Sequence, residues 1–115
     1  MCELLATSSR PRTRVSFSLG RLADRGTPGG SLADGWNVAC YDGRDVRVMR
    51  EPEPASGSPW LEQALEAARP CRLVIAHIRH ATRGGVCLAN TQPFVRELGG
   101  RMHVFAHNGM LADVD

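Results

Sequence analysis

Residues 35–51, GWNVACYDGRDVRVMRE, constrain the fold more than any other stretch of this chain. Apolar side chains occupy alternate positions in both arms of the segment: Trp36, Val38 and Cys40 before its centre, and Val46 and Val48 after it. Such alternation is typical of half-buried strands. The Asp-Gly pair at 42–43 tolerates the positive φ values of a tight turn. The segment therefore predicts a β-hairpin.

The remaining elements are short and of mixed type. In chain order they are a strand over 2–7, a helix over 16–26, a helix over 59–68, a strand over 72–79, a loop over 80–94 and a strand over 101–109. Ser58 and Pro59 have the character of an N-cap followed by proline at the first helical position. Strands outweigh helices, which predicts an α+β fold.

Size and charge exclude two classes of partner. The chain has 115 residues, enough for one domain and one modest core. Its net charge is +2, its basic residues are spread along the chain, and only 5% of residues are aromatic, so we expect no nucleic-acid surface. No apolar run approaches the roughly 18 residues that cross a bilayer, so we expect no membrane partner.

The cysteines and histidines do not form a metal-binding pattern. Four cysteines occur at irregular gaps without a CxxC pair: Cys2, Cys40, Cys71 and Cys87. This usage favours reduced thiols in the cytoplasm over a disulfide framework. The four histidines form pairs at 77 and 80 and at 103 and 107, spacings that align ligands on a helix, but both pairs lie in predicted strands. We therefore expect no metal site.

Three polar features have possible chemical roles. Cys2 directly follows Met1, and the two apolar strands end in the polar clusters HIRHATRG at 77–84 and AHNG at 106–109. Each has a structural alternative: a small buried cysteine, a solvated strand end and a simple turn. Together they supply a thiol, a cation suited to a carboxylate and an amide donor, at places where rigid strands lead into loops.

The ordered motifs resemble one known family. They are MCELL at 1–5, DGWNVACYDG at 34–43, SPW at 58–60, VIAHIRHAT at 74–82, NTQPF at 90–94, REL at 96–98 and AHNG at 106–109. This set resembles the glutaminase domain of class II (type 2) glutamine amidotransferases, within the N-terminal nucleophile hydrolases, and most of all a stand-alone bacterial subgroup. The resemblance covers essentially residues 1–115. It implies a four-layer αββα sandwich, of which this chain would be the N-terminal half.

The resemblance also implies residue roles. Cys2 would be the nucleophile once Met1 is removed, and Arg79 would bind the substrate α-carboxylate, with Thr82 assisting. The oxyanion would be held by the Asn108 side chain and the Gly109 main chain. His80 lies at a variable position on the pocket rim and is a further substrate-binding candidate. No metal or cofactor is implied; one departure is Asn37, where the family usually has glycine.

Elementary chemistry is compatible with these roles. A thiol is mostly protonated at neutral pH, and a free α-amine, which titrates near ~8, can accept its proton. The thiolate would attack the amide carbon of glutamine, ammonia would leave, and water would hydrolyse the glutamyl thioester. Two alternatives stay open: a γ-glutamyl amidase acting on a larger metabolite, as in ergothioneine synthesis, and a non-catalytic fragment that binds a partner.

Several expectations concern what lies outside these motifs. The resemblance implies that the residue that binds the substrate amino group lies beyond position 115, so we expect the chain alone to turn over weakly or not at all. A homo-oligomer and an ammonia-accepting partner are both possible. Strands that are apolar on both faces must be covered on both sides. Two helices cannot cover all of this surface, so we expect the chain to self-associate.

Overall fold

The computed structural model describes residues 2–27, 29–66, 69–110 and 112. Within them it contains six strands, two α-helices and one short 3-10 helix. In chain order these are β1 (Glu3–Thr13), α1 (Ser16–Ala23), β2 (Trp36–Asp42), β3 (Asp45–Glu51), α2 (Pro59–Glu66), β4 (Cys71–Ile78), η1 (Leu88–Asn90), β5 (Phe94–Leu98) and β6 (Arg101–Phe105). The predicted α+β class is confirmed.

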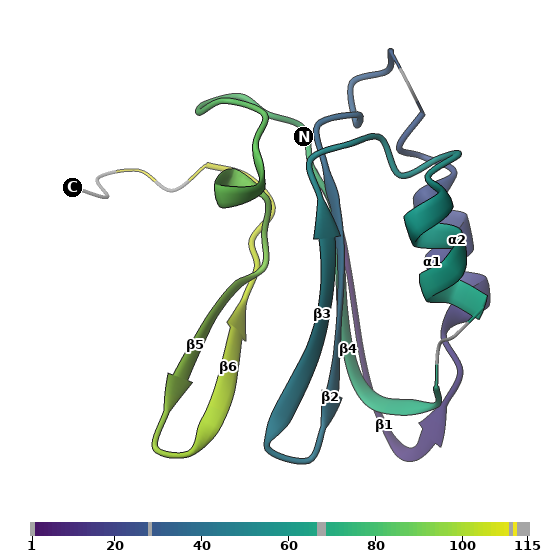
Figure 1. The fold of residues 1–115 in the computed structure, drawn as a ribbon, viewed down its shortest axis with the longest axis vertical. Coiled ribbons are helices and arrows are strands. Elements are labelled where there is room, and N and C mark those ends of the chain that lie inside the picture. Colours follow the sequence, from purple (N-terminus) through teal and green to yellow (C-terminus); the bar gives the residue numbers. More distant parts are fainter. Residues whose placement is uncertain (1, 28, 67–68, 111, 113–115) are drawn as a thin grey trace.

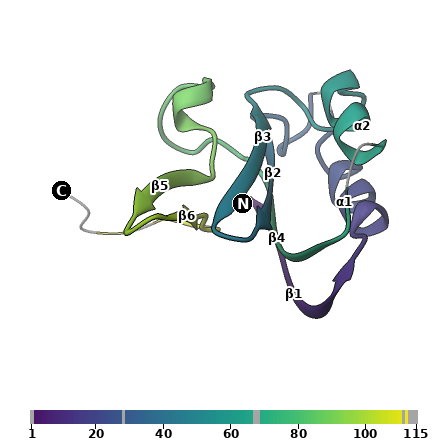
Figure 2. The same cartoon turned by 60° about the horizontal axis from the view of Figure 1, so that its bottom comes forward.

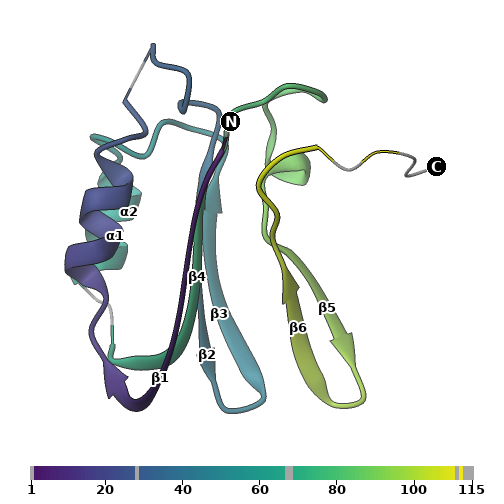
Figure 3. The ribbon, with the colours of Figure 1, turned by 180° about the vertical axis from the view of Figure 1, so that it is seen from behind.

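The elements form layers. Four strands make an antiparallel sheet in the order β1-β4-β2-β3, and β5 pairs with β6 in a separate two-stranded sheet. Helices α1 and α2 cover one face of the larger sheet, and the β5–β6 hairpin lies on the other side, next to β3 (Figures 1 and 3). Figure 2 shows the same separation from a second direction. The arrangement corresponds to one helical layer, one sheet and one hairpin of a second sheet in the expected αββα sandwich.

The β2–β3 hairpin has the register that its alternation predicts. Trp36 pairs with Glu51, and Asp42 pairs with Asp45 at the closed end. The two residues between Asp42 and Asp45 are Gly43 and Arg44, so the turn lies one position later than the Asp-Gly pair suggests. Gly43 has a φ of 65°, a value that costs glycine little.

The core lies between the larger sheet and the helices. Its buried residues are Ala23, Trp36, Ala55, Leu61 and Ile78. Helix α2 begins as predicted, because the Leu61 main-chain nitrogen donates to the Ser58 hydroxyl over 3.2 Å. The Trp36 indole nitrogen donates to Glu51 over 2.6 Å, which satisfies the one polar atom of this buried ring.

The second hairpin is fastened to the larger sheet by polar contacts. The Met102 main-chain nitrogen donates to the Arg44 carbonyl over 2.9 Å, and the Tyr41 hydroxyl donates to the Met102 carbonyl over 3.0 Å. At the other end, the Arg50 guanidinium donates to the Thr91 carbonyl over 2.8 Å. These bonds fix the relative position of the two sheets.

Several predicted bounds are wrong. β1 runs to Thr13, well past the predicted end at 7, because its polar second half forms an exposed edge that an apolar pattern does not reveal. β5 was not predicted, since all five of its residues are exposed. β6 ends at Phe105, and the residues up to 109 are irregular. Helix α1 ends at Ala23 and α2 at Glu66; residues 67 and 68 lie outside the described residues.

The expectation of reduced cysteines is wrong for one pair. Cys40 on β2 and Cys71 on β4 form a disulfide, with their Cα atoms 6.3 Å apart. The two strands are neighbours, and Cys71 lies three residues before Val74, the partner of Cys40, so the sheet order brings the two cysteines near each other. Cys2 and Cys87 are free thiols.

Candidate active site

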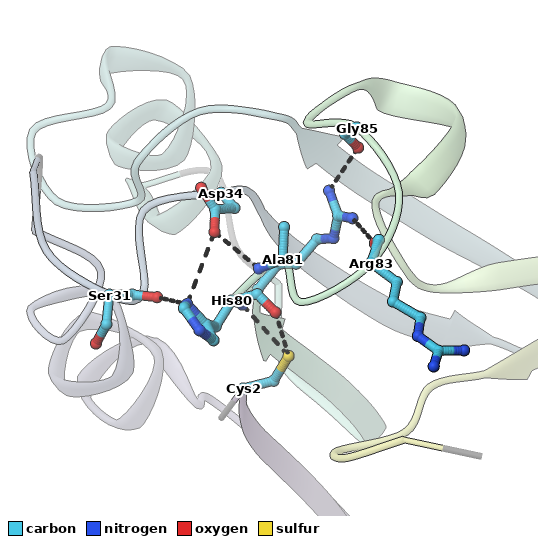
Figure 4. Close-up of polar contacts among 8 residues, drawn as sticks. Cys2, Ser31, Asp34, His80, Ala81, Arg83 and Gly85 are labelled. Carbon is cyan, nitrogen blue, oxygen red and sulfur yellow. Dashed lines mark hydrogen bonds and ion pairs between the residues drawn. The ribbon is translucent and has the colours of Figure 1, made fainter. Parts of the chain in front are cut away.

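Cys2 lies directly before β1, beside the end of β4. Its half-buried sulfur accepts a hydrogen bond from the His80 main-chain nitrogen over 3.3 Å, and its thiol points to the His80 carbonyl at 3.6 Å (Figure 4). Because Glu3 pairs with Ile78, Cys2 and Arg79 are the next residues along the two antiparallel strands. The fold therefore brings the predicted nucleophile beside two predicted substrate-binding residues.

Arg79 is a buried cation, only 6% exposed. Its guanidinium donates to the Gly85 carbonyl over 3.1 Å and to the Arg83 carbonyl over 3.2 Å. Figure 4 shows these two carbonyls on the loop that follows β4. An arginine side chain has five N–H donors, so these two contacts leave donors for a substrate carboxylate.

Asp34 and Gly35 clamp the end of β4, a role that the sequence did not reveal. The Asp34 carboxylate accepts a hydrogen bond from the Ala81 nitrogen over 2.7 Å. The Asp34 nitrogen donates to the Arg79 carbonyl over 3.2 Å, and the Arg79 nitrogen donates to the Gly35 carbonyl over 2.8 Å. These contacts hold the chain at 79–81, against which Cys2 rests. The DGW motif at 34–36 marks these residues in the sequence, but the motif does not indicate which residues they contact.

Gly35 occupies a position that is too crowded for a side chain. Its φ is +141°, and a Cβ atom there would lie 3.2 Å from the Glu51 carbonyl and 3.2 Å from the Thr91 side chain. Thr91 is itself buried, and its hydroxyl donates to the Cys87 carbonyl over 2.9 Å. Glycine at this position thus lets β2 start directly against the 91–93 segment.

The His80 side chain turns away from the cysteine. Its Nδ1 contacts the Ser31 carbonyl at short range and lies 3.8 Å from the Asp34 carboxylate. In Figure 4 the ring faces Ser31 and Asp34, whereas the main chain of His80 faces Cys2. The contact between His80 and the candidate nucleophile is made by main-chain atoms.

The other predicted residues lie on exposed irregular segments. Thr82 is exposed on the loop after β4. Asn108 and Gly109 are exposed after β6, and Gly109 has a φ of +110°. Among the described residues, no polar contact joins any of these three to Cys2. Their roles stay predictions.

A row of buried polar side chains lies on the sheet face opposite the helices. His77 and Asn37 are paired neighbours on β4 and β2, and their side chains are 0% and 1% exposed. Within the described part of the chain, neither side chain has a hydrogen-bond partner, nor does Nδ1 of His107. In the sequence His77 is one of the histidines that could suggest a metal ligand and Asn37 is a departure from the family motif, and neither signal gives the pair a role.

The pKa of His77 is lowered from 6.5 to about 4, and burial of the ring is the largest cause. The charges of His107 and Arg79 contribute to the same lowering, while the main chain of His107, close by but outside hydrogen-bond geometry, favours the charged form. His77 is therefore neutral at physiological pH. Its neutral ring adds no positive charge beside Arg79.

The described residues contain neither a metal-ligand cluster nor a membrane-crossing helix. Within residues 2–27, 29–66, 69–110 and 112, no three histidine, cysteine, aspartate or glutamate side chains gather as a metal site would require. No described helix has the length and apolar character needed to cross a membrane.

A family model for class II glutamine amidotransferases matches residues 1–115. The chain therefore belongs to this family. An Escherichia coli K12 protein named "Putative glutamine amidotransferase YafJ" is 42% identical over 111 residues, which cover 96% of this chain and 44% of that protein. A Haemophilus influenzae protein named "Putative glutamine amidotransferase" is 39% identical over 114 residues, covering 99% of this chain and 39% of the relative.

A solved structure has the same fold. It is a 2.0 Å crystal structure of a "predicted glutamine amidotransferase" from Pseudomonas aeruginosa PA01, with a TM-score of 0.58 and 37% identity. The match covers 99% of this chain and 45% of the crystallised one. The chain thus spans less than half the length of these relatives.

Proposed function

We propose that Cys2 is the nucleophile of a glutaminase reaction in which the amide of glutamine is hydrolysed through a glutamyl thioester. The observation that carries this proposal is the position of the Cys2 sulfur against the main chain of His80, one residue after Arg79. A nucleophile and a carboxylate-binding cation side by side suit an amino-acid substrate.

The proposed roles follow from chemistry at these positions. After removal of Met1, the free amine of Cys2 takes the thiol proton, and the sulfur attacks the amide carbon of glutamine. Arg79 uses its remaining donors to hold the α-carboxylate through paired hydrogen bonds. His80 and Thr82 line the rim of this pocket.

Oxyanion stabilisation is assigned to Asn108 and Gly109. The asparagine amide and the glycine main-chain N–H would bind the oxygen that becomes negative as sulfur attacks, and one such donor is typically worth about 100- to 1,000-fold in rate. The C–N bond then breaks, and the proton on the Cys2 amine passes to the departing ammonia. Water hydrolyses the thioester and releases glutamate. No cofactor enters these steps.

The physiological substrate has two candidates. The groups assigned above bind the glutamyl half of the substrate, so a γ-glutamyl amide of a larger amine fits them equally well. A domain that only binds a partner is the alternative without catalysis, and an ammonia-accepting partner or a homo-oligomer goes with the enzyme. A nucleophilic thiol persists best where thiols stay reduced, so we propose a cytoplasmic location, in which Cys40 and Cys71 would also be exposed to reductants.

Product analysis tests this function. The longest natural protein that contains this sequence is incubated with glutamine and, separately, with a γ-glutamyl amide of a bulky amine. Release of glutamate in either case, lost in Cys2→Ser, supports the proposal and identifies the substrate class. An unchanged rate in Cys2→Ser, or no glutamate from either compound, contradicts it.

A further inference from the structure

A basic depression lies at the end of the sheets far from Cys2. Four arginines from four separate segments line it: Arg12 on β1, Arg44 in the β2–β3 turn, Arg72 on β4 and Arg101 on β6. Tyr41, Leu73, Met102 and His103 line it too, and no lining residue is acidic. Its volume is about 580 Å³. Figure 1 shows the two hairpin turns together at this end, away from the N-terminus.

The four guanidinium groups are not neutralised by the described residues. None of them forms an ion pair or a side-chain hydrogen bond there. The carboxylates of the neighbouring turns do not line the depression. Asp42 pairs with Arg47 at 3.2 Å, and Glu97 accepts a hydrogen bond from the Gly100 nitrogen. Asp45 is exposed outside the depression. Four like charges converge without a counter-charge.

The frame that holds these charges is fixed by hydrogen bonds. The Met102 nitrogen bonds to the Arg44 carbonyl, and the Tyr41 hydroxyl bonds to the Met102 carbonyl, so the two hairpins cannot separate freely. Arginines held close together raise the local positive potential and attract anions. Each guanidinium also presents a planar fork that matches phosphate oxygens.

We propose that this depression binds a small molecule that carries two or more phosphate groups. One phosphate would leave most of the four positive charges uncompensated, whereas a diphosphate or triphosphate would engage several forks at once. The volume of about 580 Å³ lies within the range of about 300–1,000 Å³ usual for ligand pockets. Leu73 and Met102 offer an apolar wall to the rest of such a molecule.

The site is separate from the candidate active site. Arg72 and Arg79 lie on or directly after the same strand, seven residues and therefore about 23 Å apart at ~3.3 Å per residue. A single-stranded nucleic acid is the less favoured occupant, because such sites use several aromatic platforms. Tyr41 is the one aromatic ring of phenylalanine, tyrosine or tryptophan type in the lining, and its hydroxyl is already engaged.

Inorganic pyrophosphate is the probe for this proposal. Its binding to the chain is followed at low ionic strength by calorimetry and by ³¹P NMR line width, which does not require a monomeric protein. Pyrophosphate should bind at least about tenfold more tightly than orthophosphate. Arg72→Gln/Arg101→Gln should weaken pyrophosphate binding by about tenfold or more, as should Arg44→Gln/Arg72→Gln if the first pair unfolds the chain.

The matched control is Arg21→Gln/Arg69→Gln, which removes the same charge from two exposed arginines on the helical side. It should change the affinity by less than about twofold. Equal weakening by the control pair, equal binding of orthophosphate, or absence of pyrophosphate binding would each overturn the proposal. So would binding of a short oligonucleotide alone, which would assign the surface to nucleic acid. None of these readouts depends on glutaminase activity.

Discussion

The main-chain nitrogen of His80 donates a hydrogen bond to the sulfur of Cys2 across 3.3 Å, joining two residues 78 positions apart. The contact exists because β1 and β4 are paired neighbours. The position of the Cys2 sulfur therefore depends on the main chain at 79–81. Hydrogen bonds with Asp34 and Gly35 hold that segment in place. Substitutions in this clamp should therefore affect both stability and the position of the sulfur.

Gly35→Ala should lower the free energy of unfolding by about 2–4 kcal/mol, because it combines a backbone strain with overpacking against Glu51 and Thr91. Urea denaturation followed by far-UV circular dichroism measures the loss. Gly43→Ala is the matched control, since Gly43 has a φ of +65° but a Cβ atom there would meet nothing within 4 Å. That variant should lose only about 1 kcal/mol. A Gly35→Ala loss no larger than that of Gly43→Ala would contradict the clamp.

Arg79→Lys should raise the KM for glutamine by about 10- to 100-fold in the longest natural protein that contains this sequence. Lysine cannot copy the paired hydrogen bonds of a guanidinium to a carboxylate, nor hold the carbonyls of Arg83 and Gly85 together. Steady-state kinetics give the value. Arg83→Lys is the control, because Arg79 uses only the main chain of Arg83. Unchanged kinetics in Arg79→Lys would reduce Arg79 to a structural residue.

Stability should fall as the pH drops from about 6.5 to about 4. The pKa of His77 is near 4 in the folded chain and near 6.5 when exposed, so the unfolded chain binds more protons in this window. The difference between these two pKa values corresponds to up to about 3 kcal/mol of folding free energy. This stabilisation is fully present above pH 6.5 and is lost as the pH falls toward 4. His77→Gln should flatten this dependence in urea denaturation, and the exposed control His103→Gln should keep it. The same slope in His77→Gln would assign the effect to other groups.

The 115-residue chain should self-associate. Large apolar side chains are exposed on the β5–β6 hairpin, with Phe94 and Phe105 opposite each other at 44% and 53% and Leu98 at 55%. Exposed apolar strands favour association. Sedimentation velocity should show species larger than a monomer, and Leu98→Lys should reduce them. The control Phe17→Lys, on helix α1, should not. A concentration-independent monomer would contradict the prediction.

The sequence predicts those elements whose pattern reflects burial on one face. The β2–β3 hairpin, both helices and β4 are found near their expected positions because apolar residues mark their buried sides. The second half of β1 and all of β5 escape prediction because they are exposed, and exposure leaves no periodic apolar signal. The loop that the sequence predicts over 80–94 ends at Phe94, which is the first residue of β5.

Contacts between distant segments could not be predicted from local pattern. The Cys40–Cys71 disulfide depends on β2 lying beside β4, and no local feature specifies that order. The link between Cys2 and His80 depends on β1 lying on the other side of β4. The family resemblance supplied the candidate residues, whereas the clamp by Asp34 and the contacts of the Arg79 guanidinium emerge only from the three-dimensional arrangement.

The most direct test of Cys2 as a chain-terminal nucleophile is the intact mass of the protein before and after reaction with a glutamine-like diazoketone. We expect a starting mass without Met1 and a single adduct, which Cys2→Ser abolishes. Cys87→Ser, which removes the exposed free thiol, should keep the adduct. A retained Met1, or an adduct that survives in Cys2→Ser and disappears in Cys87→Ser, would contradict the account.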